Sequence, residues 1–281
     1  MALNPLKICW LEYLYKNKVF DGKKSILDLG PQDLTTKKDF IKKIVSYRFE
    51  PNELENILSK IYNSNGSIKE NFQSFFYSLW ELEEYYSLDY NDLRADYKYD
   101  LNKLHNFDVS FDIITNFGTA EHIFNIGIFF ENLHNLLKPN GIALNVTPCY
   151  GDINHGFWNI HPNVYSQLIK TNKYYQHSFI YLDNYVGKNA LLNETLDNYD
   201  FENIKIDLGS KETNWSDMQY LGKFREKVYK IFTENIKNEN SLKYFNNPER
   251  GIFDYIFTAF EKTVNTKFTP PAIYNRYYII G

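Results

Sequence analysis

The stretch that decides the fold runs from Ser25 to Asp33 and reads Ser-Ile-Leu-Asp-Leu-Gly-Pro-Gln-Asp. Its apolar residues favour β-structure, show no alternation and stop abruptly at Gly30, which is typical of a short buried strand in a parallel sheet. Because glycine adopts positive φ and has no Cβ, a ligand can approach the backbone at this turn. A helix that begins after Asp33 would direct its free N–H groups to the same place. We therefore expect a small polar ligand at the carboxyl end of this first strand.

Strands and helices alternate along the rest of the chain. Two further buried strands are predicted at Phe111–Asn116 and Ile142–Val146, and residues 120–137 between them have helical spacing. Residues 176–182 and 201–208 are interpreted as two closing strands that form an antiparallel pair. This alternation predicts an α/β fold built on an open, mostly parallel sheet with an antiparallel last strand.

Three segments are expected beside this sheet, within a single domain over residues 1–281. Ile8–Tyr15 has the spacing of a helix that packs against the sheet. Residues 35–86 are predicted to form a helical insertion, much longer than one crossover helix needs. This insertion is interpreted either as a lid over the cofactor or the acceptor, or as a packing embellishment or dimer surface. Residues 209–281 are predicted to form a C-terminal extension, in which 252–261 fits either a strand or a helix.

The composition disfavours several classes of protein. A net charge of −4 and a pI near 5.9 argue against a protein that coats nucleic acid. The two cysteines, Cys9 and Cys149, lie far apart and lack metal-type spacing, which fits a reducing compartment. No apolar stretch approaches the roughly 20 residues that span a bilayer. We expect a cytoplasmic protein without a nucleic-acid or membrane partner, and a homodimer is left open.

Polar residues follow the ends of the predicted strands, where the ligand of such a sheet lies. An acid one strand after a glycine turn, here Asp89 after Gly30, can accept both hydroxyls of an adenosine ribose. The next three residues of the turn are Pro31, Gln32 and Asp33, so the glycine fingerprint of a pyrophosphate site is absent. The carboxylate of Asp33 would also repel phosphates. An adenosine that carries an amino-acid-like tail and no phosphate fits this turn better than NAD.

Five segments resemble, in order, the motifs of class I S-adenosylmethionine-dependent methyltransferases, and the resemblance covers residues 24–146. The segments are Ile26-Leu-Asp-Leu-Gly-Pro-Gln32, Ser87-Leu-Asp89, Tyr99-Asp-Leu-Asn102, Phe111-Asp-Ile-Ile-Thr-Asn-Phe-Gly-Thr-Ala-Glu-His122 and Leu136-Leu-Lys-Pro-Asn-Gly141. The resemblance implies a Rossmann-like sheet and S-adenosyl-L-methionine as the cofactor. A later segment, His155-Gly-Phe-Trp-Asn-Ile-His161-Pro, is similar to a bacterial subgroup whose members modify sugars or small precursors of surface glycans.

The resemblance implies roles for the residues around the methionine and ribose parts of the cofactor. Asp28 and Gly30 would shape the turn around the methionine part. Gln32 would hydrogen-bond the methionine carboxylate or the acceptor, and Asp89 would hold the ribose hydroxyls. Pro31 stands where a second glycine is common in the family, so we expect the tail of the cofactor to be held differently in this chain.

The resemblance also implies roles around the adenine and the sulfonium. Asp100 and Leu101 would frame the adenine, with the carboxylate of Asp100 accepting a hydrogen bond from the exocyclic amine. Asn116 and Gly118 would form the floor of the site near the sulfonium. All four residues follow predicted strands or short apolar segments, which is where a doubly wound sheet places its ligand.

Transfer of a methyl group to a hydroxyl needs a base, and histidine is the usual one near neutral pH. His155 is the favoured base because it lies in the loop where acceptors bind. His122, beside Glu121, is the second choice, and its alternative role is to tie a helix to a loop. Related enzymes with a fuller Glu-x-x-Glu-His pattern bind a divalent metal, whereas Gly118 replaces the first Glu here. We therefore expect no metal, although Glu121, His122 and His155 could converge.

Tyr150, Trp158 and His161 are predicted on the acceptor side, where the two aromatic rings offer flat apolar surface; His161 precedes Pro162 and also suits the start of a helix. The leading hypothesis is methyl transfer from S-adenosyl-L-methionine to a hydroxyl or amine of a small acceptor. We expect a sugar or a nucleotide-linked glycan precursor of surface polysaccharide biosynthesis. The alternatives are an NAD-type oxidoreductase on the same sheet and a non-catalytic scaffold with a methyltransferase fold.

Overall fold

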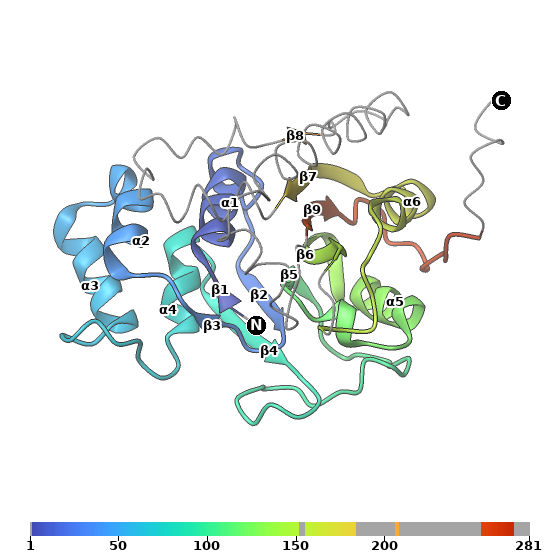
Figure 1. Ribbon diagram of the computed structural model, residues 1–281, viewed down its shortest axis with the longest axis horizontal. Coiled ribbons are helices and arrows are strands. Elements are labelled where there is room, and N and C mark those ends of the chain that lie inside the picture. The colour runs from blue at the N-terminus through green and yellow to red at the C-terminus, as the bar shows by residue number, and fades with distance from the viewer. Residues whose placement is uncertain (1, 152–154, 184–205, 208–253, 273–281) are drawn as a thin grey trace, which may run out of the picture.

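The computed structural model describes residues 2–151, 155–183, 206–207 and 254–272 (Figure 1). Their main sheet has seven strands in the order β4-β2-β5-β6-β9-β7-β8. The strands are β2 (Ser25–Leu29), β4 (Glu84–Leu88), β5 (Phe111–Asn116), β6 (Leu137–Tyr150), β7 (Tyr175–Asp183), β8 (Ile206–Asp207) and β9 (Asp254–Glu261). The first four strands in that order pair in parallel, and β9 is antiparallel to both of its neighbours. The predicted α/β sheet, mostly parallel with an antiparallel last strand, is confirmed.

Helices cover both faces of the sheet, as Figure 1 shows: α1 to α4 lie on one side, and α5 and α6 on the other. The helices are α1 (Pro5–Lys16), α2 (Lys38–Val45), α3 (Pro51–Ile61), α4 (Gln73–Tyr77), α5 (Ile126–Leu136) and α6 (Pro162–Asn172), with short 3₁₀ turns η1 (Ser46–Arg48), η2 (Ser78–Trp80) and η3 (Ala120–His122). No helix of the described residues is long and apolar enough to cross a membrane. The architecture is therefore a three-layer sandwich around one sheet.

The pleat of β2 explains why its apolar run does not alternate with polar residues. All five of its residues are buried. Ile26 belongs to the core under α1 to α4, whereas Leu27 and Leu29 belong to the core under α5 and α6. Successive side chains of a strand point to opposite faces, so a strand covered on both faces needs apolar residues throughout. Ser25 and Asp28 are the polar exceptions, and the environment of Asp28 is described with the site.

The helical segment between β2 and β4 packs onto the same face of the sheet as α1. Its buried side chains, among them Leu58 and Trp80, share one core with Trp10 of α1. A buried carboxylate fastens the two parts together: Glu12 accepts hydrogen bonds from the indole Nε1 of Trp80 at 3.0 Å and from the guanidinium of Arg48 at 3.1 Å. Residues 35–86 were predicted to be a helical insertion. The helices α2, α3 and α4 within them form most of one helical layer, whereas residues 84–86 belong to β4.

The structure differs from expectation directly after the first turn. No helix begins after Asp33; instead β3 (Asp33–Leu34) pairs in parallel with β1 (Ala2–Leu3), and α2 starts only at Lys38. The extended partner comes from the N-terminal end of the chain, which local sequence signals at Asp33 cannot reveal. The helix N-terminus that was expected to face the ligand is therefore displaced along the chain.

The two closing strands, β7 and β8, join the main sheet through β9, which lies much later in the sequence. The predicted pair of strands is present as β7 and β8, which pair antiparallel at Ile180 and Tyr181, while residues 201–205 and 208 lie outside the described residues. β9, for which the sequence left strand or helix open, is a strand between β6 and β7. Of the predicted C-terminal extension, residues 209–253 and 273–281 lie outside the described residues, and its described part contributes β9 to the sheet.

A side chain at Gly141, near the start of β6, should destabilise the fold. A Cβ at this position would lie 2.8 Å from the carbonyl oxygen of Lys138 and 2.9 Å from that of Phe111. Because both neighbours are backbone atoms, we expect Gly141→Ala to lower the free energy of unfolding by about 1–3 kcal/mol. A methyl group on Gly127 in α5 would meet nothing within 4 Å, so Gly127→Ala should be neutral or stabilising by up to about 1 kcal/mol. Urea unfolding measures both, and equal effects of the two substitutions would contradict the packing argument.

Candidate functional site

The order of the strands reverses between β2 and β5, because β4 lies on one side of β2 and β5 on the other. Ligands of doubly wound sheets bind at such a switch point, outside the carboxyl ends of the strands. Gly30 follows β2 with φ of 81°, and its N–H donates to the carbonyl of Leu88 at 2.8 Å. Gly118 follows β5 with φ of 103°. Both central strands therefore end in turns that favour glycine, as expected for Gly30.

Asp28 is fully buried in the middle of β2. Its Oδ1 accepts hydrogen bonds from the hydroxyl of Tyr77 at 2.8 Å and from the hydroxyl of Thr115. Its Oδ2 is buried as well. Burial raises the pKa of Asp28 to about 7, although the hydroxyls of Thr115, Tyr77 and Tyr85 lower it. Asp28, which was predicted to shape the turn around the methionine part of a cofactor, is thus a buried carboxyl group beneath the helical layer.

Lys7 brings a buried positive charge to the same region. Its Nζ donates to the carbonyl oxygen of Ala2 at 2.9 Å and to that of Phe117, directly after β5, at 3.2 Å. Burial lowers the pKa of Lys7 to about 8, against the opposing effect of the carboxylates of Glu121 and Asp28. Lys7 was not predicted as a site residue from the sequence. The one indication was a charged residue within the otherwise apolar first half of α1.

The turn after Gly30 is closed by its own side chains. Gln32 is fully buried, and its Nε2 donates to the carbonyl of Gly30 at 3.0 Å. The backbone carbonyl of Gln32 accepts from the side chain of Gln73 at 3.2 Å. The structure therefore gives Gln32 a role in shaping the turn, beside the ligand contact predicted from the sequence. The exposed carboxylate of Asp33 pairs with Arg94 at 2.7 Å.

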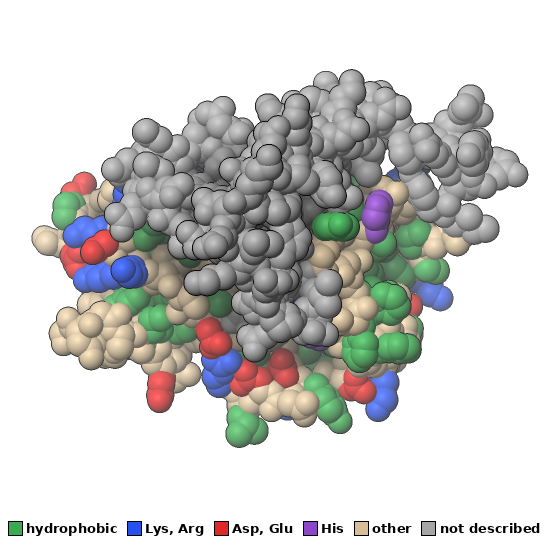
Figure 2. Space-filling view, in the orientation of Figure 1, with side chains coloured by type: hydrophobic (Ala, Val, Ile, Leu, Met, Phe, Trp, Pro, Cys, Tyr) green, Lys and Arg blue, Asp and Glu red, His purple; other side chains and the backbone are tan. Residues whose placement is uncertain are grey.

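Asp89 follows β4 and is oriented by the backbone after it. Its Oδ1 accepts from the N–H groups of Asn91 at 2.7 Å and Asp92 at 2.9 Å, whereas no described residue donates to its Oδ2. Arg94 binds Asp92 at 2.6 Å as well as Asp33, and so ties the segment after β4 to the turn after β2. Figure 2 shows charged side chains of both signs at the lower edge of the molecule, where this segment lies in Figure 1.

The predicted adenine residues occupy a turn between β4 and β5. Asp100 accepts from the backbone and side-chain nitrogens of Asn102, at 3.0 and 3.1 Å. These hydrogen bonds, chiefly the one from the backbone of Asn102, hold the pKa of the Asp100 carboxyl below its usual value. Leu101 is buried in the core under α5 and α6. The turn thus presents the ionised carboxylate of Asp100, while the buried side chain of Leu101 packs into the core.

Asn116, at the end of β5, positions the residues that follow it. Its Oδ1 accepts from the N–H of Ala120 at 3.0 Å and of Thr119 at 3.3 Å, and its Nδ2 donates to Asn145 on β6 at 3.0 Å. These bonds cap the short turn η3, which carries Glu121 and His122. Asn116 is therefore a scaffold of the predicted floor near the sulfonium.

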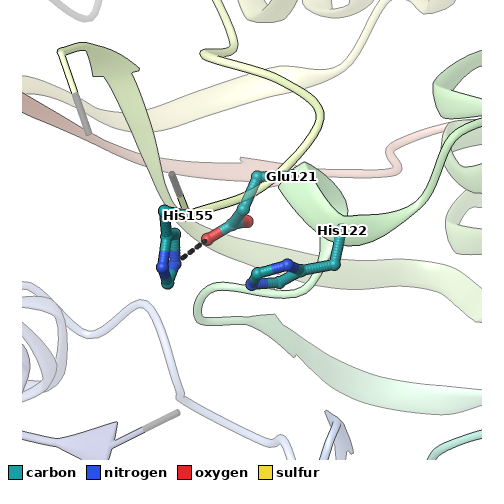
Figure 3. A group of neighbouring side chains, drawn as sticks. All are labelled: Glu121, His122 and His155. Carbon is teal, nitrogen blue, oxygen red and sulfur yellow. Dashed lines mark ion pairs between the residues drawn. The ribbon is translucent and has the colours of Figure 1, made fainter. Parts of the chain in front are cut away.

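Glu121, His122 and His155 converge, as Figure 3 shows: the carboxylate of Glu121 points toward His155, and the imidazole of His122 turns into the same space. Oε1 of Glu121 lies 3.7 Å from Nε2 of His155, and the two imidazole rings lie 4.7 Å apart in an edge-on arrangement. Glu121 is buried, His155 is partly buried and His122 is exposed. The three predicted catalytic residues thus form one cluster.

The loop that carries His155 is fastened to η3 by the backbone of Glu121. The carbonyl oxygen of Glu121 accepts from the N–H of Phe157 at 2.7 Å and of Trp158 at 3.2 Å. A Cβ on Gly156 would lie 2.6 Å from the same oxygen, so only glycine allows this approach. Gly156 was not singled out from the sequence, although its place between His155 and two aromatic residues was a usable signal.

The predicted acceptor residues lie around this cluster in different roles. Tyr150 is exposed at the end of β6. The indole Nε1 of Trp158 donates to the carbonyl of Ile123 at 3.0 Å, which holds its ring beside η3. His161 is the N-cap of α6 and accepts from the N–H of Asn163 at 3.1 Å. The capping contact of His161 fits its alternative role at the start of a helix.

The raised pKa of Asp28 predicts a pH-dependent cost of folding. Between about pH 4 and 7 the folded protein keeps this carboxyl protonated while the unfolded chain does not, so stability falls as pH rises, by at most about 1.4 kcal/mol per pH unit. Asp28→Asn removes this term, and its stability relative to wild type should rise across the window. Urea unfolding at about pH 5 and about pH 7.5 measures it. Asp108→Asn, at an exposed site, is the control, and parallel pH dependences of wild type and Asp28→Asn would contradict the assignment.

Comparisons with known proteins give weak structural likenesses. No family model matches the chain, and no curated protein matches it. One similar solved structure is the O-methyltransferase from a trans-AT PKS multienzyme of Brevibacillus brevis in complex with S-adenosyl-L-homocysteine. It is 13% identical with a TM-score of 0.37, over 93% of this chain and 74% of that one.

Two other similar structures carry related names. Phosphoethanolamine N-methyltransferase 2 of Haemonchus contortus, in complex with S-adenosyl-L-methionine, is 14% identical with a TM-score of 0.40, and the match covers 90% of this chain and 52% of that one. A SAM-dependent methyltransferase from Archaeoglobus fulgidus is 13% identical with a TM-score of 0.36, over 90% and 93% of the two chains. At these identities and TM-scores the likeness does not assign an activity to this chain.

Proposed function

We propose that this protein transfers a methyl group from S-adenosyl-L-methionine to an oxygen or nitrogen of a small acceptor. The observation that carries the proposal is the composition of the switch point. A glycine turn after β2 lies beside an oriented acid after β4, and the cluster of Glu121, His122 and His155 follows β5. The first two elements suit an adenosine, and the third suits proton removal from an acceptor.

The charges and free acceptors of the site support a cofactor that carries positive charge. Glu121 keeps one buried carboxylate oxygen without a hydrogen-bond partner among the described residues, and Asp89 keeps one oxygen that no described residue engages. A sulfonium and an ammonium group are attracted to such carboxylates, whereas a pyrophosphate is repelled. The negative charge of these carboxylates therefore favours S-adenosyl-L-methionine over NAD, the cofactor of the alternative oxidoreductase.

Different residues of this chain would bind different parts of the cofactor. Asp89, held by two backbone N–H groups, would accept from the ribose hydroxyls through its Oδ2. Asp100, ionised and fixed by Asn102, would accept from the adenine amine. Gly30 and Gly118 would let the tail and the sulfonium approach the backbone. When bound, the cofactor supplies a methyl group already activated by the positive sulfur, so the protein mainly has to align the acceptor.

His155 would take the proton of a hydroxyl acceptor. Its Nε2 faces the buried carboxylate of Glu121 at 3.7 Å, which favours the protonated imidazole that results. In the transfer step, the acceptor O–H bond would break and its proton would go to His155. The acceptor oxygen would bond to the methyl carbon supplied by the cofactor, and the electron pair of the broken C–S bond would remain with sulfur. His122, on the other side of Glu121, would hold the acceptor or assist the transfer.

We further propose a sugar or nucleotide-linked sugar as the acceptor, in the biosynthesis of surface polysaccharides. The support is an exposed aromatic surface directly beside the cluster. Phe124 lies 5.5 Å from Phe157 and 6.2 Å from Trp158, measured between ring centroids, and all three rings are exposed. Flat aromatic faces pack well against the C–H faces of sugars and against nucleobases. Tyr150 adds a further exposed ring at the end of β6.

The proposal predicts that Asp89 carries much of the cofactor affinity. Asp89→Ala should weaken binding of S-adenosyl-L-homocysteine by roughly 10- to 100-fold, the effect of losing hydrogen bonds to a charged group worth about 1.5–3 kcal/mol. Asp108→Ala, at an exposed site elsewhere, is the matched control and should bind as wild type does. Titration calorimetry gives both affinities, with NADH as the competing ligand. Binding of NADH in place of S-adenosyl-L-homocysteine would reject the proposal, and so would an unchanged affinity of Asp89→Ala.

A further inference from the structure

The geometry points to a divalent transition-metal site formed by Glu121, His122 and His155. We infer that it takes a zinc- or cobalt-like ion in preference to magnesium. The ion itself needs only these three side chains, and its use in catalysis rests on the proposed function. This inference reverses the expectation drawn from the sequence, where Gly118 in place of a fourth ligand argued against a metal.

The three side chains are arranged as ligands of one ion. One ligand atom from each, a carboxylate oxygen and two imidazole nitrogens, lies within 4.8 Å of the other two. Metal bonds of about 2.0–2.2 Å bring the atoms of a tetrahedral site to roughly 3.3 Å from one another. Small side-chain rotations close the difference, because the side chain of His122 is exposed and Oε1 of Glu121 already lies 3.7 Å from His155.

A second observation points to a missing cation. Glu121 is 1% exposed, and its Oε2 is buried without a hydrogen-bond partner among the described residues. A buried carboxylate oxygen that lacks a donor is costly, whereas a bound cation satisfies it. The nearby ammonium group of Lys7 does not do so, since it donates to the backbone carbonyls of Ala2 and Phe117. The carboxylate is therefore held in place by η3, while its Oε2 lacks a hydrogen-bond donor among the described residues.

The backbone holds the ligands together independently of the ion. Glu121 accepts from Phe157 and Trp158 through its carbonyl oxygen, and Gly156 permits the close contact. This places His155, one residue before Gly156, opposite the carboxylate of Glu121 (Figure 3). Two loops that follow different strands are thus fixed to each other at the cluster, which is the preorganisation that a metal site requires.

The ligand types select the ion. Two imidazoles and one carboxylate suit borderline transition metals, whereas magnesium and calcium prefer oxygen ligands in octahedral or larger shells. Gly118, three residues before Glu121, has φ of 103°, a conformation that a side-chain-bearing residue rarely adopts. The turn that presents Glu121 is therefore built for glycine and not for an additional carboxylate. Within the described residues, the group of ligands has these three members.

A three-ligand site leaves coordination positions open. His122 and His155 are the more accessible members of the cluster, so the open positions of a bound ion would face the outside of the protein. An oxygen of the acceptor bound there would lose its proton more readily. With an ion bound, His155 holds the ion, and the ion promotes loss of the acceptor proton. Without an ion, His155 accepts the proton itself. Removal of the ion by a chelator would therefore impair methyl transfer in the first case only.

The test is metal binding by the full chain in the absence of cofactor, after removal of metals with a chelator. Titration calorimetry with ZnCl₂, CoCl₂ and MgCl₂, together with the visible absorption of bound Co²⁺, should show one tight site for zinc and cobalt and at least ten-fold weaker binding of magnesium. His122→Ala, at an exposed position, should weaken Co²⁺ binding by at least ten-fold, with circular dichroism as the check of its fold. Glu121→Gln should do the same, with circular dichroism as the check of its fold.

Two further variants separate a designed site from general affinity of histidine for metals. His177→Ala is the matched control, because His177 pairs with Glu261 at 2.8 Å and no third ligand joins them in the part of the chain that the structure describes. This variant should bind as wild type does. Gly156→Ala keeps all three ligands but forces the loop away from Glu121, and it should weaken Co²⁺ binding. An absence of zinc and cobalt binding by the wild-type chain would overturn the inference, and so would wild-type affinity in His122→Ala. Binding of S-adenosyl-L-homocysteine, measured separately, decides the proposed function whichever way this test falls.

Discussion

The parallel pairing of β2 with both β4 and β5 is the constraint on which the rest of the structure depends. β2 is buried on both faces, so its position and its register are fixed by two cores at once. This pairing places Gly30, Asp89 and Gly118 at one edge of the sheet. It also encloses Asp28, a carboxyl group whose raised pKa shows that burial outweighs the hydroxyls of Tyr77 and Thr115. β2 is buried on both faces and yet carries an acid at the site, where hydrogen bonds from Tyr77 and Thr115 accommodate the carboxyl group.

From this edge, the cluster of Glu121, His122 and His155 is built through a short series of backbone contacts. Asn116 at the end of β5 caps η3, and η3 presents Glu121 to the interior. The carbonyl of Glu121 then holds the loop of Phe157 and Trp158, which brings His155 back to the carboxylate. Each contact is local, yet together they join two loops that are separated in the sequence. The same preorganisation serves a base in the proposed methyl transfer and ligands in the inferred metal site.

Sequence reasoning found the elements whose signals are local. The apolar run of β2, the strand Phe111–Asn116 and the glycine turn at Gly30 are present as predicted. It failed at Asp33, where a strand partner from the N-terminal end replaces the expected helix start, and it left β9 undecided. Both depend on pairing between distant segments, which local propensity does not encode. The cluster of Glu121, His122 and His155 could be suggested but not placed, because His155 lies on a different loop.

The sequence by itself determined the class of sheet, the glycine turns and the acids that end the strands, since these follow from strand period and from the conformational freedom of glycine. Tertiary structure alone decided what those residues do. It turned Gln32 onto its own turn, made Asn116 a cap and buried Lys7 beside the end of β5. It also brought Glu121, His122 and His155 within reach of one ion. The physical reason is that burial and hydrogen-bond partners, which set the charge and direction of a side chain, come from residues distant in the sequence.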